Sequence, residues 1–152
     1  MSTREARIAR VVHLRDQRLK LAVKALEEAR ALERRVQAEL SSAQSTRQSA
    51  EAARRELIRT GTDIRHFIEA EEWLRARLIE EELCGLRVQK ARVQVDRGQL
   101  KVKEAALKLR QLELLQERLR QARRAKETRA ERATEDEIGQ RVAQRERRKG
   151  QL

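Results

Sequence analysis

No proline interrupts the 152 residues of this chain, and that absence restricts the possible folds more than any other feature. Proline ends or kinks helices, and only five glycines are present to shape loops. Alanine, glutamate, lysine, leucine and arginine together exceed the share of roughly 50% that is typical of coiled coils. One tryptophan and one phenylalanine cannot build an aromatic core. The sequence therefore predicts an all-α chain of long helices.

Apolar residues recur at alternating spacings of four and three, which is the pattern of a narrow coiled-coil seam. Eleven of fifteen seam positions from Ile8 to Leu57 are apolar, as are twelve of sixteen from Phe67 to Leu119. Apolar residues also alternate from Val93 to Leu114, as in a strand, but no turn residues divide that run into strand lengths. We therefore predict two helices that pack along one seam.

One stop-and-start signal, Thr60-Gly61-Thr62-Asp63, separates the two seams. Glycine adopts the left-handed conformation that ends a helix, and Thr62 or Asp63 can cap the next helix. We predict a single domain, a long antiparallel two-helix coiled-coil hairpin with an overhanging C-terminal helix. Its expected parts are a helix over about 4–59, a turn at 60–63, a helix over about 64–132 or beyond, and a basic tail to residue 152 that frays in water. With Gly61 at the bend, residue i faces about residue 122 minus i.

The formal net charge is +12, with the basic excess in residues 1–60 and 120–152. Such a field attracts phosphates, acidic proteins or anionic lipid. Arginines alternate with glutamates and tyrosine is absent, so nucleic acid is a less favoured partner than protein. The lone Cys84 needs no oxidising compartment, and no apolar run is long enough for a membrane span or an export signal. We expect a cytoplasmic protein.

Catalytic patterns are lacking in the sequence. His13 and His66 lie at opposite ends of the predicted hairpin, and no Cys or acidic neighbour completes a ligand set for a metal. Cys84 lies on the seam, where no base is placed to activate it. We predict that the protein is not an enzyme and has no metal and no cofactor.

A second apolar stripe follows the second helix at intervals of seven residues, about 160° from the seam. A two-helix hairpin cannot bury both surfaces. The stripe is either a docking surface for another protein or a surface for weak self-association. Its members are Ile79, Leu86, Val93, Leu100, Leu107 and Leu114.

This layout resembles the central stalk proteins of type III secretion, the flagellar FliJ and injectisome YscO family. The resemblance covers nearly the whole chain and rests on two long helices, one tight bend and a longer second helix. The opening segment with Arg4, Arg7, Ile8 and Val12 is similar to that family's start, and Glu135-Asp136-Glu137-Ile138 with Gln140-Arg141 is similar to its end. Few aromatic residues lie near the bend, which fits the injectisome branch, a virulence system, better than the flagellar branch.

The resemblance implies a non-catalytic stalk that is peripheral to the inner-membrane secretion machinery. Its open end would bind a hexameric export ATPase through Arg4, Arg7, Ile8, Arg10, Val12, Arg120, Arg123 and Arg124. Its bend would face an export gate protein through Ile64, Phe67 and Trp73, and the hairpin could also hold secretion chaperones. The alternatives are a structural or peripheral-stalk coiled coil and a basic nucleic-acid-associated helical rod.

Overall fold

The computed structural model describes residues 3–151, which form two α-helices and no strand within that range. Helix α1 spans Thr3–Thr60 and helix α2 spans Ile64–Gly150. The contacts divide the chain into two units. Gln17–Ala106 form the hairpin unit, and Met1–Asp16 with Leu107–Leu152 form the terminal unit. The predicted all-α hairpin is confirmed, whereas the assignment of the whole chain to one domain stays a prediction.

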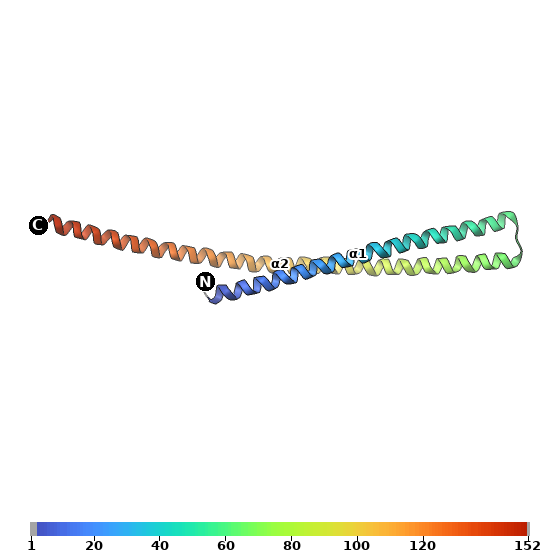
Figure 1. The fold of residues 1–152 in the computed structure, drawn as a ribbon, viewed down its shortest axis with the longest axis horizontal. Helices are drawn as coiled ribbons and strands as arrows, with labels where there is room; N and C mark the ends of the chain where they lie inside the picture. Colours follow the sequence, from blue (N-terminus) through green and yellow to red (C-terminus); the bar gives the residue numbers. More distant parts are fainter. Residues whose placement is uncertain (1–2, 152) are drawn as a thin grey trace. The chain divides into compact units, whose positions relative to one another are not determined.

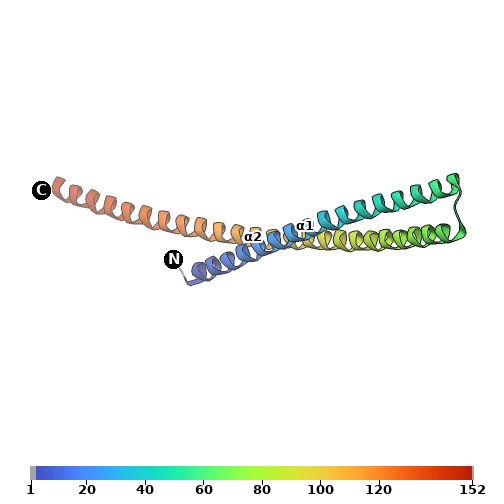
Figure 2. The ribbon, with the colours of Figure 1, turned by 45° about the vertical axis from the view of Figure 1, so that its right-hand side comes forward.

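The hairpin unit contains the turn and the helical segments on either side of it. Figures 1 and 2 show these segments of α1 and α2 side by side and running in opposite directions. Val36, Val88 and Ala91 form a buried cluster, against which Leu32 and Leu40 pack. The remaining buried hydrophobic residues of the unit are Leu26, Ala43, Ala50, Leu74, Cys84 and Val95. Every one of these residues except the half-buried Leu32 lies on the predicted seam, so burial follows the heptad spacing.

Two polar residues on the seam form an ion pair between the helices. Arg47 and Glu81 are both seam positions, and the Arg47 guanidinium donates a hydrogen bond to the Glu81 carboxylate. Arg47 also contacts Glu51 at 3.1 Å. The hydrogen bond that Arg47 donates to Glu81, followed by the one that it donates to Glu51, raises the pKa of Arg47. A polar pair at one seam level favours the alignment that keeps both charges partnered.

The turn forms by the predicted stop-and-start mechanism. Gly61 has a φ of 76°, in the left-handed region that L side chains rarely adopt. Of the two candidate capping residues, Asp63 caps α2. Its Oδ1 accepts a hydrogen bond from the His66 backbone N–H at 3.0 Å, and its carbonyl accepts one from the Phe67 N–H at 3.2 Å.

The expected pairing register needs a correction. A bend centred on Gly61 would place Leu26 opposite Asp96. In the structure Leu26 lies against Gly98 instead, and a Cβ added to Gly98 would be only 3.2 Å from Leu26 Cδ1. The shift arises because residues 61–63 all lie outside the helices, which centres the turn on Thr62. Gly98 therefore permits a close approach between the helices in addition to weakening α2 locally.

The terminal unit joins the start of α1 to the second part of α2. Leu109 is buried, and Ile8, Ala9, Gln116 and Leu119 line a small groove of about 60 Å³ with Glu5 and Arg120. Beyond Arg123, residues 124–150 are helical and exposed on all sides. Arg147, Arg148 and Lys149 in the last turn complement the negative end of the helix dipole. Because this segment buries nothing, we keep the prediction that it frays in water.

Replacing Ala43 by cysteine is expected to produce a disulfide with the native Cys84 within one chain. Ala43 and Cys84 are both buried and lie one heptad from Val36 and Ala91, which share a core cluster. The disulfide is measured by electrophoresis without reductant across a dilution series. Ser41→Cys is the control, because residue 41 is exposed and two residues turn the side chain by roughly 200°. Cross-links that form only between chains would instead indicate a parallel dimer.

Candidate partner-binding surfaces

The predicted open-end residues all belong to the terminal unit. Their side chains divide into two kinds. Ile8 and Val12 are half-buried, because they are seam positions that pack against α2. The exposed members are arginines on both helices, namely Arg4, Arg7, Arg10, Arg120 and Arg124. The terminal unit thus presents cations around a partly covered apolar seam.

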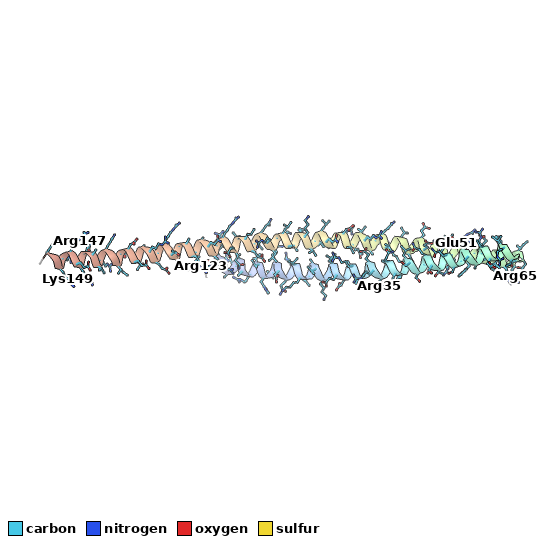
Figure 3. The ribbon with its side chains drawn as sticks, turned by 90° about the horizontal axis from the view of Figure 1, so that it is seen from above. Arg35, Glu51, Arg65, Arg123, Arg147 and Lys149 are labelled. Carbon is cyan, nitrogen blue, oxygen red and sulfur yellow. The ribbon has the colours of Figure 1, made fainter. Side chains whose placement is uncertain are left out.

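Arg123 differs from the other open-end arginines. Its Nη1 donates a hydrogen bond to Glu5 Oε2 at 2.9 Å, joining α2 to the first turn of α1. It also contacts Glu127 at 3.7 Å. Figure 3 shows Arg123 at the level where α1 begins. Arg123 therefore links the two helices of the terminal unit, and its charge is less available to a partner than those of Arg120 and Arg124.

A basic cluster lies at the end of α2, within the basic tail that the sequence predicts. Arg141, Arg145, Arg147, Arg148 and Lys149 are all exposed, with Glu146 as the only acidic residue among residues 141–149. Figure 3 shows Arg147 and Lys149 at this end of the helix. The sequence predicts the basic tail as a whole, but the residues expected to bind a partner end at Arg124.

The bend presents more apolar surface than the sequence analysis assigned to it. Ile64 is 78% exposed and Trp73 is 44% exposed, whereas Phe67 is half-buried on the seam. Ile58 and Ile68 are also exposed, and neither was predicted. Both lie off the seam, which is the signal that could have identified them.

An acid–histidine pair sits at the start of α2. Asp63 Oδ1 lies 2.6 Å from His66 Nδ1, and both side chains are largely exposed. The hydrogen bond that the His66 ring donates to Asp63 raises the pKa of His66 above its ordinary value of 6.5. The hydrogen bonds from the His66 backbone and ring lower the pKa of Asp63 below 3.8.

We expect this pair to stabilise the turn in a limited pH window. The histidine contribution is complete below pH 6.5 and is lost as the pH rises through the raised pKa of His66. The aspartate contribution is complete above pH 3.8 and is lost as the pH falls through the lowered pKa of Asp63. In Asp63→Asn, the pKa of His66 measured by NMR titration should fall toward 6.5. Glu69→Gln is the control and should give a smaller fall, since Glu69 acts only through its more distant charge. Equal shifts in the two variants would contradict the assigned hydrogen bond.

The second stripe on α2 is exposed at every predicted position. Its members in the hairpin unit are Ile79, Leu86, Val93 and Leu100, which range from 47% to 66% exposed. Leu107 and Leu114, in the terminal unit, are 57% and 43% exposed. The stripe is therefore not part of the seam packing in either unit.

The chemistry of residues 3–151 offers binding surfaces and no metal centre. No group of three or more His, Cys, Asp or Glu side chains within that range could hold a metal ion. Cys84 is a buried free thiol. No helix among those residues is long and apolar enough to cross a membrane.

A family model described as flagellar FliJ protein matches residues 4–148, which is nearly the whole chain. No curated protein and no solved structure gives a significant match.

Proposed function

The chain belongs to the flagellar FliJ family, and from that premise we propose that it is the central stalk that connects a hexameric export ATPase to the export gate. The family consists of non-catalytic stalk components of flagellar and type III protein export. The observation that supports the proposal is the match of the family model to residues 4–148 of this chain, which itself folds as a two-helix hairpin.

The open end is the surface we assign to the ATPase. Five exposed arginines from both helices flank the half-buried Ile8 and Val12. A ring of subunits can contact such a surface from several sides at once, and arginine suits carboxylates on the walls of a pore. The exposed helix after Arg123 has no packing partner among the described residues and would gain one on entering the ring.

The bend is the surface we assign to the export gate. Ile58, Ile64, Ile68 and Trp73 are exposed apolar side chains around a turn that Gly61 and Asp63 define. Exposed apolar groups close together are typical of protein-binding sites. We further propose that the protein works in the cytoplasm, at the periphery of the inner-membrane export machinery, and that it can hold secretion chaperones.

The test is an ATPase assay with a hexameric export ATPase from the same organism. Adding the full chain should raise the rate of ATP hydrolysis and the fraction of hexamer measured by analytical ultracentrifugation. Both increases follow by mass action if the chain binds the closed ring more tightly than it binds the free subunits. No effect on either quantity, together with tight, salt-sensitive binding to random duplex DNA, would contradict the proposal in favour of a nucleic-acid-associated protein.

A further inference from the structure

The face of α2 that points away from the seam carries an open groove in the hairpin unit. The groove has a volume of about 660 Å³. Its apolar lining residues are Leu83, Leu86 and Val93, which are 50%, 50% and 47% exposed. Its basic lining residues are Arg87, Lys90 and Arg97, which are interspersed with the apolar ones along the helix. Every lining residue comes from α2, so the groove is one face of a single helix.

The spacing of the lining residues suits a helix as the occupant. Leu83, Leu86, Lys90, Val93 and Arg97 follow one another at intervals of three and four, the arrangement of one helix face. They extend along roughly 21 Å of α2, which is about four helical turns. An amphipathic helix of that length could lay its apolar side along Leu86 and Val93.

The charge of the groove specifies the occupant further. No acidic residue lines it, and Arg87, Lys90 and Arg97 form no ion pair within residues 3–151. Interhelical arginines behave differently, since Arg47 pairs with Glu81 and Arg54 pairs with Glu71. The groove therefore combines apolar surface with three cations that the described chain does not neutralise.

We propose that this groove binds an amphipathic helix of a partner protein whose apolar stripe is flanked by acidic residues. A second copy of the chain fits less well, because two-fold pairing through the groove would bring together two sets of Arg87, Lys90 and Arg97. The proposal is independent of the ATPase assignment, because the groove lies in the hairpin unit and the open-end residues lie in the terminal unit.

The test uses the full chain and three fluorescent synthetic peptides, each about three heptads long. The first has leucines on one face flanked by glutamates. The second has lysines in place of the glutamates, and the third is a scrambled version of the first. Anisotropy should show saturable, salt-sensitive binding of the first peptide, and about tenfold or weaker binding of the other two.

Paired variants separate the groove from the general positive charge of the chain. Leu86→Asp with Val93→Asp should weaken binding of the glutamate peptide by about tenfold or more. Leu21→Asp is the control, because Leu21 is an exposed leucine of α1 in the same unit.

Arg87→Glu with Arg97→Glu should transfer the preference to the lysine peptide. Arg30→Glu with Arg34→Glu changes the net charge equally and should leave the preference unchanged. Circular dichroism checks that each variant is helical.

Three results would overturn the proposal. Equal affinity for the glutamate and scrambled peptides would show that charge alone drives the binding. Concentration-dependent dimerisation that is lost in the Leu86/Val93 variant, without binding of the glutamate peptide, would assign the groove to a second copy. Binding to phosphatidylglycerol vesicles that is lost in the same variant, again without binding of the peptide, would assign it to a membrane surface.

Discussion

Deletion of residues 1–12 together with 120–152 is expected to abolish stimulation of the export ATPase. The deletion removes all eight open-end residues and the basic cluster at the end of α2. The core cluster around Val36, Val88 and Ala91 remains, as does the turn. The truncated chain should therefore stay helical by circular dichroism while the rate of ATP hydrolysis returns to that of the ATPase alone.

Charge reversal tests the same surface without shortening the chain. Changing Arg4, Arg7 and Arg10 to glutamate should weaken the stimulation, and the loss should shrink as salt is added, because exposed charges are screened over roughly 8 Å at physiological ionic strength. Reversing Arg30, Arg34 and Arg35 is the matched control, since these exposed arginines lie in the hairpin unit. Full stimulation by the doubly truncated chain would contradict the assignment of the open end to the ATPase.

Replacing Val88 by aspartate is expected to cause the largest loss of stability of any single change considered. Val88 is 3% exposed and lies in the core cluster with Val36 and Ala91. An unpartnered carboxylate there costs several kcal/mol, or forces local unfolding instead. For a chain of this size, a loss of about 4 kcal/mol lowers the thermal midpoint by roughly 10 °C.

Val93→Asp is the matched control for that experiment, because Val93 lies on the same helix but is 47% exposed. Its thermal unfolding is followed by circular dichroism at 222 nm. The free energy of unfolding should change by less than about 1 kcal/mol. If the two variants had the same thermal midpoint, Val88 would not stabilise the packing of α1 against α2, and the core would lie elsewhere.

Most of the helical architecture could be predicted because it depends on local patterns. All predicted seam positions are buried or half-buried, from Ile8 to Leu57 on α1 and from Phe67 to Leu119 on α2. Gly61 ends α1 because only glycine adopts a positive φ without strain. The stripe through Leu86 and Val93 is exposed because a side chain two residues from the seam points to the opposite side of its helix.

The candidate surfaces were less predictable, because they depend on contacts between residues far apart in the chain. The seam spacing could not show that Arg123 is held by Glu5, which distinguishes it from Arg120. Ile58 and Ile68 differ from Arg123, because their positions off the seam could have predicted their exposure.

The sequence by itself determined the helices, the position of the turn and the faces that pack, because heptad spacing, glycine and capping residues act over a few neighbouring residues. The tertiary structure decided the pairing register, with Leu26 against Gly98 and Arg47 against Glu81. It also decided which cations remain unpaired in the groove of α2. These features depend on how two helices meet, and side-chain packing and ion pairing across the seam select one alignment among several that the heptad repeat allows equally.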